Sequence, residues 1–206
     1  MHLLTLICGI VLLEKAYTLK CYECVPGSAG DCTDKETQCP RGQRCGALRI
    51  LTYAGDIKAA DVNMKSCLLA NQCIEGSINF GLSKTVITSR CCNSELCNSQ
   101  PAPAGPSKSS PNGKKCYSCN GQKCTTILNC EGNEDHCISS KVTIGRETVT
   151  VKGCASKLIC SNEAQIPGSV GAEISCCQGD LCNSASSTGA GFLLLVAPLL
   201  ASVVFS

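Results

Sequence analysis

The 206-residue sequence has no tryptophan, four tyrosines and three phenylalanines, so aromatic side chains supply little of any core. Its 18 Lys and Arg residues nearly balance 16 Asp and Glu residues, and this scattered net charge of +2 excludes the basic surface that binds nucleic acid. Histidine occurs at two positions, His2 and His136. Since no Ser or Cys nucleophile has a credible base, we expect no enzyme, no cofactor, no metal site and no small-molecule substrate. We interpret the Asp135-His136 pair as a polar surface position.

Cysteine is the residue in excess, at 21 of 206 positions. This density is typical of disulfide scaffolds that fold outside the reducing cytosol, and it favours disulfides over zinc for the Cys-x-x-Cys pairs. Apart from Cys8, the cysteines form two runs of ten, with gaps of 2, 7, 6, 5, 21, 5, 17, 0, 4 and 2, 4, 5, 6, 16, 5, 15, 0, 4 residues. The sequence is therefore an internal repeat.

Both ends of the chain carry apolar stretches that indicate processing signals. Residues 1–18 are typical of a secretory signal peptide, which would remove Cys8. Residues 184–206 hold a small-residue spacer and an apolar tail, as in a propeptide for glycosylphosphatidylinositol (GPI) attachment, with Asn183 or Ser184 as the lipidated residue. A transmembrane helix is disfavoured because the tail is shorter than the ~20 residues that cross a bilayer.

The rest of the chain divides into a first module at residues 19–99, a Pro/Ser-rich linker at 100–114 and a second module at 115–183. The linker lacks apolar anchors, so we expect an extended segment and modules that need not share a rigid interface. Alternating apolar residues predict strands at 48–53, 62–64 and 85–88, and a hairpin in which residues 142–144 and 149–151 flank a glycine turn. No window inside the modules has sustained helical periodicity.

Two motifs in each module carry a resemblance to a known family. Each module begins with Cys-Tyr-x-Cys, at residues 21–24 and 116–119, and ends with Cys-Cys-x4-Cys-Asn, at 91–98 and 176–183. The chain thereby resembles the lymphocyte antigen 6 / urokinase receptor family, twice over. This resemblance implies an all-β, small disulfide-rich fold of two tandem three-finger (snake-toxin-like) domains. It also implies that Asn98 and Asn183 hydrogen-bond to backbone as structural residues.

The resemblance further implies a disulfide pairing, which spacing alone leaves open. In the first module the implied bridges are Cys21–Cys45, Cys24–Cys32, Cys39–Cys67, Cys73–Cys91 and Cys92–Cys97. In the second they are Cys116–Cys137, Cys119–Cys124, Cys130–Cys154, Cys160–Cys176 and Cys177–Cys182. Five cross-links per module compensate for cores too small to offset the entropy of the unfolded chain.

For function, the resemblance and the tail together favour a GPI-anchored receptor or modulator at the cell membrane, extracellular side, that binds an extracellular or cell-surface protein. An alternative is a secreted inhibitor that resembles the two-domain gamma-type phospholipase inhibitors. A further alternative is a modulator of nicotinic acetylcholine receptors that acts through Arg146. Candidate partner contacts are Arg49, Tyr53, Phe80 and Arg146, because Tyr and Arg are common in interface hot spots. For each we favour a structural explanation, in which the aromatic rings cover the module and the arginines are solvated.

Overall fold

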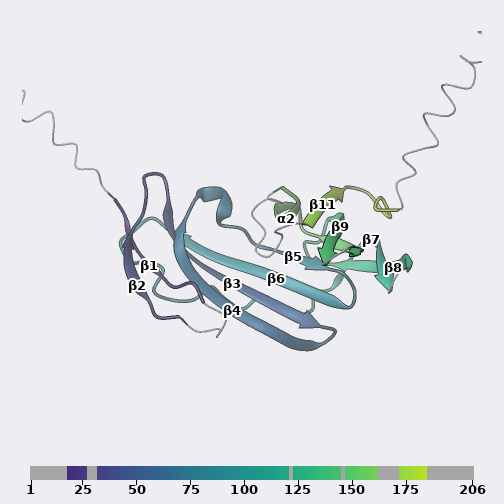
Figure 1. Ribbon diagram of the computed structural model, residues 1–206, viewed down its shortest axis with the longest axis horizontal. Coiled ribbons are helices and arrows are strands. Elements are labelled where there is room, and N and C mark those ends of the chain that lie inside the picture. The colour runs from purple at the N-terminus through teal and green to yellow at the C-terminus, as the bar shows by residue number, and fades with distance from the viewer. Residues whose placement is uncertain (1–17, 27–31, 121–122, 145–146, 162–171, 185–206) are drawn as a thin grey trace, which may run out of the picture.

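The computed structural model describes residues 18–26, 32–120, 123–144, 147–161 and 172–184. Most of the expected signal peptide, all but Ser184 of the expected propeptide, and Arg146 lie outside these ranges. Within them, no helix is long and apolar enough to span a membrane. The described elements are almost all strands, which confirms the all-β, disulfide-rich class (Figure 1).

The first module contains three hairpin-like fingers. Strands β1 (Lys20–Glu23) and β2 (Lys35–Gln38) pair as the first finger, and β3 (Arg44–Ala54) and β4 (Ile57–Leu68) form the long second finger. The third finger consists of β5 (Gly76–Asn79) and β6 (Ser83–Cys92), preceded by the 3-10 turn η1 (Ala70–Gln72). The expected strands at 48–53, 62–64 and 85–88 are confirmed, whereas β1, β2 and β5 have too little apolar alternation to be predicted.

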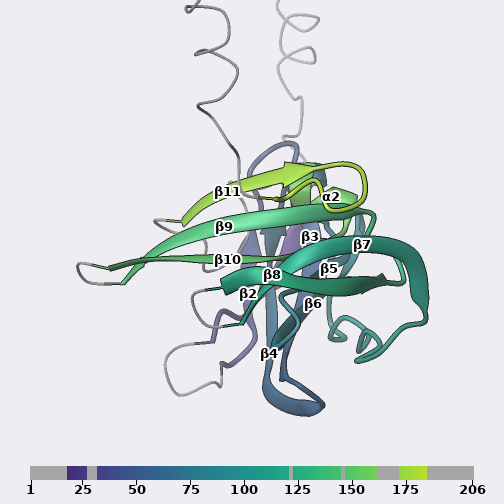
Figure 2. The same cartoon turned by 90° about the vertical axis from the view of Figure 1, so that its right-hand side faces the viewer.

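The second module repeats this order of elements. Strands β7 (Pro111–Asn120) and β8 (Lys123–Glu131) form its first finger, and β9 (His136–Ile144) and β10 (Glu147–Ala155) form the second, which confirms the expected hairpin. The third finger contributes the short helix α2 (Lys157–Ser161) and strand β11 (Ala172–Cys177), which pairs with β9. In Figure 2, β9, β10 and β11 run across the view, whereas β4 and its neighbours run down it.

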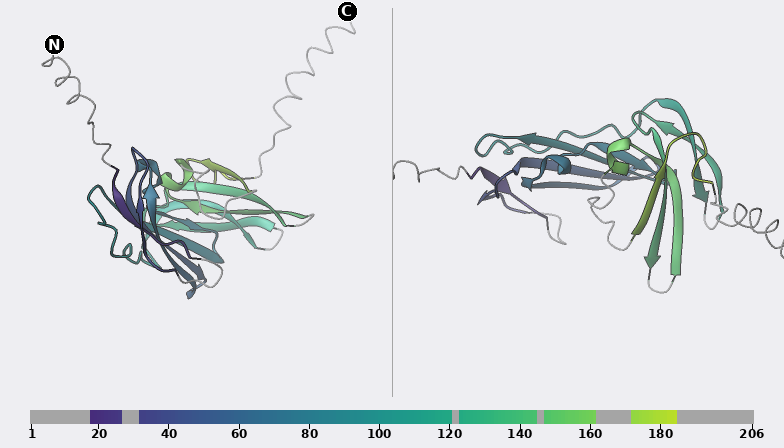
Figure 3. Two further views of the ribbon diagram at one scale, coloured as in Figure 1. Left: turned by 60° about the vertical axis from the view of Figure 1, so that its left-hand side comes forward. Right: turned by 90° about the horizontal axis from the view of Figure 1, so that it is seen from above.

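One sheet of seven strands joins the two modules, in the order β11-β9-β10-β5-β6-β3-β4. The joining pair is β10 with β5, antiparallel, with Cys154 opposite Asn79 and Ala155 opposite Ile78. This differs from the expectation of modules without a rigid interface. Figure 3 shows the two sets of strands meeting directly, and we call the contact around β5 and β10 the junction.

Among the described residues, buried side chains form three clusters of two different kinds. Disulfide cysteines dominate the cluster at the base of each module, which we call its palm. The third cluster lies at the junction and is aliphatic. Its buried members are Ile74, Ile78 and Ile87 from the first module and Ile138, Ala155 and Ile159 from the second. These isoleucines are scattered singly between cysteines in the sequence, and only the folded chain brings them together.

The segment expected to be a free linker packs along the first module instead. Ala102 is buried, and Thr88 donates a hydrogen bond of 2.6 Å to the Pro103 carbonyl. Lys108 forms an ion pair of 2.8 Å with Asp56 at the end of the second finger. The linker also ends earlier than expected, since residues 111–114 already belong to β7. Most of its contacts use backbone groups and small side chains, so composition gives no sign of them.

Candidate binding surface

One buried asparagine completes each palm. Asn98 Oδ1 accepts a 2.9 Å hydrogen bond from Tyr22 N, and its Nδ2 donates to the carbonyls of Tyr22 and Gly46 at 2.8 and 3.0 Å. Asn183 repeats the arrangement, with two 2.9 Å bonds to the backbone of Tyr117. Each side chain joins the last turn of its module to the first strand, so its role is structural.

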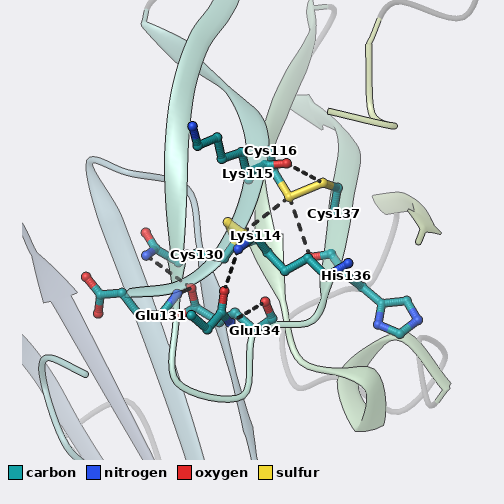
Figure 4. The surroundings of a disulfide bond; sticks show 12 residues. Lys114, Lys115, Cys116, Cys130, Glu131, Glu134, His136 and Cys137 are labelled. Carbon is teal, nitrogen blue, oxygen red and sulfur yellow. Dashed lines mark hydrogen bonds between the residues drawn. A yellow bond between two sulfur atoms is a disulfide. The ribbon is translucent and has the colours of Figure 1, made fainter. Parts of the chain in front are cut away.

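The described residues contain ten disulfides, five in each module, and none joins the two modules. Their pairing is the one that the resemblance implies. Figure 4 shows Cys116–Cys137, with Cys130 Sγ 3.4 Å from Cys116 Sγ. The sulfur clusters that could resemble metal sites, such as Cys116 with Cys130 and Cys154, consist of these bonded cysteines. They offer no thiolate to a metal ion.

The junction holds a buried carboxylate, Glu134, from the loop before β9. It is 0% exposed, and its oxygens accept hydrogen bonds from Ser77 Oγ at 3.0 Å, Asn79 Nδ2 at 3.4 Å and Glu131 N at 2.9 Å. Lys84 Nζ lies 3.5 Å from it and 2.8 Å from Glu131. Burial opposes ionisation of Glu131, but the bonds from Lys84 and from Ser109 N hold its pKa below the usual value.

Strand β5 is enclosed on both faces by the second module. Glu134 bonds to Ser77 and Asn79 on one face, and Ile78, between them in the strand, packs against the second module on the other. At the edge, Ser156 N donates to the Ser77 carbonyl at 3.0 Å, and Ser77 N donates to Ser156 Oγ at 3.1 Å. The two modules therefore share backbone bonds, a buried charge and an apolar cluster.

Beside the junction is an open, mostly apolar depression of about 200 Å³, which we call the junction groove. Phe80, Gly81 and Leu82 line it from the first module, and Ser118, Cys119, Asn120, Thr126, Ile127 and Leu128 line it from the second. Leu82 and Ile127 are 71% and 55% exposed. Exposed aliphatic residues gathered around a hollow are typical of interaction sites.

The structure does not bring together at one site the three expected contact residues that it describes, which are Arg49, Tyr53 and Phe80. Phe80 lines the junction groove and also packs against the aliphatic cluster, so it joins the two modules. Tyr53 lies half-buried near the end of β3, and Arg146 lies outside the described residues. Leu82 and Ile127 were missed because apolar residues at single positions give no signal in the sequence until two modules place them side by side.

Arg49 is engaged within its own sheet. Its Nε and Nη2 donate to the two carboxylate oxygens of Asp61, both at 2.8 Å, and Lys58 Nζ lies 2.9 Å from the same carboxylate. The hydrogen bond from Arg49, supported by Lys58, holds the pKa of Asp61 well below its usual range despite partial burial. Arg49 is thus a paired side chain of the β3–β4 finger rather than a free contact.

Asp135 and His136 form a local pair, with 2.9 Å between the carboxylate Oδ1 and the ring Nδ1. Burial opposes ionisation of Asp135, but the hydrogen bond and charge of His136 keep its pKa below the usual value. In Figure 4 the His136 ring points away from the disulfide. No Ser hydroxyl is bonded to the ring in the described residues, and the pair is a half-buried hydrogen-bonded contact between neighbours in the chain.

Two three-finger modules, each with five disulfides and a buried terminal asparagine, define a class of small extracellular folds. Comparison with known proteins agrees with this assignment of the fold. The u-PAR/Ly-6 domain matches residues 17–100, and the family of snake toxins and toxin-like proteins matches residues 115–183. Lymphocyte antigen 6E from chicken (Gallus gallus) is 30% identical over 44% of this chain and 78% of its own length. The chain belongs to the u-PAR/Ly-6 family.

Other relatives are longer than this chain. The urokinase plasminogen activator surface receptor of mouse (Mus musculus) is 31% identical over 61% of this chain and 43% of the receptor. Mouse Ly6/PLAUR domain-containing protein 3 is 27% identical over 87% of this chain and 57% of its own length. The chain thus matches about half the length of these two relatives. A crystal structure of mouse TEX101 covers 80% of this chain with a TM-score of 0.31 and 17% identity.

Proposed function

We propose that the protein is a GPI-anchored cell-surface protein without catalytic activity, which binds an extracellular protein through the junction groove. Family membership supports a binding role, since one relative is by name a surface receptor for urokinase plasminogen activator. The observation that carries the proposal is the groove itself, which needs both modules and exposes Leu82 and Ile127.

The expected occupant is an apolar side chain of the partner protein. About 150 Å³ of apolar space is enough for a benzene ring, and the groove offers about 200 Å³. Because the lining is mostly apolar and holds no charged residue, an aliphatic or aromatic residue fits it better than a charged one. A groove between two rigid modules is also pre-organised, which lowers the entropic cost of binding.

For the anchor, the surroundings of the two candidate residues favour Ser184. Asn183 is 6% exposed, and its amide bonds to the backbone of three other residues, including Ile138 at 3.0 Å and Gly153 at 3.4 Å. Ser184 is exposed and is the last described residue of the second module. Attachment at Ser184 leaves the whole palm intact, with small residues Ala185 and Ser186 behind it as the transamidase requires.

The anchor is tested by treating expressing cells with a phosphatidylinositol-specific phospholipase C. We expect release of a two-module protein whose C-terminal peptide ends at Ser184 and carries ethanolamine. Retention on the cell after effective cleavage of a control GPI protein contradicts the anchor. Secretion without enzyme treatment favours the inhibitor alternative.

The groove is tested by proximity labelling on intact cells. Leu82→Asp and Ile127→Asp place a charge in the groove, and Leu69→Asp, at a residue 44% exposed outside the groove, is the matched control. We expect a set of extracellular proteins labelled by the wild type and the control to be lost in both groove variants, at equal surface expression. An unchanged labelled set in both variants contradicts binding through the groove.

A further inference from the structure

A second cavity lies on the polar face of the second module, away from the junction groove. It measures about 520 Å³, and strands β9, β10 and β11 line it together with the last turn at Asn183 and Ser184. Figure 2 shows these three strands side by side. This volume is in the range of ordinary ligand sites, which span about 300 to 1,000 Å³.

Strand register makes this face polar. Ser139 of β9 lies opposite Lys152 of β10 and Ser175 of β11. The next row places Lys141 between Thr150 and Glu173. Neighbouring residues in the same strands, such as Ile138, face the aliphatic cluster instead. The cavity therefore has hydroxyl and ammonium donors on the face opposite the apolar packing.

Lys152 is the residue that most needs an explanation. It is 8% exposed and lines the cavity, yet its ammonium has no hydrogen bond or ion pair within the described part of the chain. Lysine commonly buries its alkyl stem and keeps its ammonium in contact with water, and this holds for Lys152, because Arg44 Nε is the only fully buried side-chain nitrogen or oxygen without a partner in the described residues. Lys152 therefore presents an unpaired ammonium to the open cavity. The only carboxylate in the two rows, Glu173, is 81% exposed and lies 3.3 Å from Lys141 Nζ. The cavity is thus lined by Lys152, which has no partner in the described part of the chain, and by Lys141, which is paired with an exposed carboxylate.

We propose that this cavity binds a phosphate group, with Lys152 and Lys141 as the charged donors and neighbouring hydroxyls as the neutral ones. Charge-assisted hydrogen bonds from ammonium groups to phosphate oxygens are among the stronger polar interactions in proteins. A single bound phosphate gives Lys152 a partner of opposite charge.

The proposed anchor offers such a phosphate next to the cavity, and this part of the inference rests on the proposed function. Attachment breaks the Ser184–Ala185 peptide bond and joins the Ser184 carbonyl to the amine of the ethanolamine phosphate on the GPI lipid. The phosphorus then lies about 5 to 6 Å from the new amide, from ordinary bond lengths. Since Ser184 itself lines the cavity, the phosphate reaches it at high effective concentration. A free phosphate is the other source.

The test uses protein released from cells by the phospholipase, which retains the ethanolamine phosphate, and follows its phosphorus by ³¹P NMR. In the wild type we expect a phosphorus signal broadened by the slow tumbling of the protein. In Lys152→Gln the width of this signal should fall about twofold or more. Lys123→Gln removes an exposed lysine of β8 and is the matched control, with an unchanged signal. Added inorganic phosphate leaves the wild-type signal unchanged, because the cavity is occupied.

The remaining outcomes separate the two sources and the two proposals. In one outcome the anchor phosphorus is mobile, but inorganic phosphate binds to the wild type and binds at least about tenfold more weakly to Lys152→Gln. The cavity is then a phosphate site whose ligand is a free phosphate rather than the anchor. If the chain is secreted without an anchor, the proposed anchoring fails, and titration of the secreted protein with inorganic phosphate tests the cavity by itself. A mobile anchor phosphorus without phosphate binding overturns the phosphate site, as does binding that Lys152→Gln leaves unchanged.

Discussion

The palms and the junction are held by different kinds of interaction. Each palm is a cluster of disulfide sulfurs completed by one buried asparagine, whereas the junction combines aliphatic side chains, a buried carboxylate and strand pairing. Disulfides stabilise mainly by restricting the unfolded chain, whereas apolar burial acts in the folded state. Each module is therefore specified by covalent bonds, and the arrangement of the two modules is specified by packing.

The largest effect is expected from removing a palm disulfide. Cys130→Ser with Cys154→Ser deletes a bridge of sequence separation 24 and should lower the free energy of unfolding by about 2 to 5 kcal/mol. The matched control is removal of Cys119–Cys124, separation 5, where a shorter loop predicts a smaller loss. Denaturant unfolding measures both. Equal losses from the two deletions contradict a loop-entropy origin.

Gly153→Ala should open the junction and leave all ten disulfides intact. The added Cβ would overlap the backbone oxygen of Asn79, so β10 must move away from β5. We expect a loss of about 1 to 3 kcal/mol, typical of overpacking, with faster hydrogen exchange at Ala155 and Ser156 only. Gly42→Ala is the control, since its methyl group meets nothing within 4 Å and carries only the local cost of a φ of 83°. Unchanged exchange at β10 in Gly153→Ala contradicts the strand pairing.

Glu134→Gln tests the buried charge at nearly constant volume. The amide cannot accept with both ends, so the donors Ser77, Asn79 and Glu131 N lose part of their bonding, at a cost of about 1 to 3 kcal/mol. Glu173→Gln, at an exposed carboxylate, should change the free energy of unfolding by less than about 0.5 kcal/mol. Equal thermal midpoints for the two variants would show that Glu134 does not hold the junction.

The smallest effect is expected at the Arg49–Asp61 pair. Asp61→Asn should cost about 0.5 to 1 kcal/mol, because partly exposed ion pairs contribute little. The pKa of Asp61 is lowered in the folded state, so the contribution is fully present above its usual value of about 3.8 and declines as pH falls below it. Unfolding curves of wild type and Asp61→Asn should therefore converge toward low pH. A gap that widens on acidification contradicts this sign.

Features of the sequence that are local or repeated predict much of the fold. Cysteine spacing and the Cys-Asn ends predict the class of fold, and alternation predicts β3, β4, β6, β9 and β10. The junction could not be predicted because Ile78 and Ile159 are isolated apolar residues that meet only when both modules are arranged in space. Glu134 and Leu82 were missed for the same reason, since a charge or a leucine in a loop is ordinary until its surroundings are known.

The central claim is that noncovalent contacts at the junction hold the modules together, and cutting the linker tests it most directly. Lys108 is exposed, and no disulfide crosses it, so limited trypsin digestion after Lys108 leaves two halves without a covalent link. We expect the nicked protein to elute as one species in native, non-reducing gel filtration and to separate only in denaturant. Two separate species in native buffer would contradict the claim.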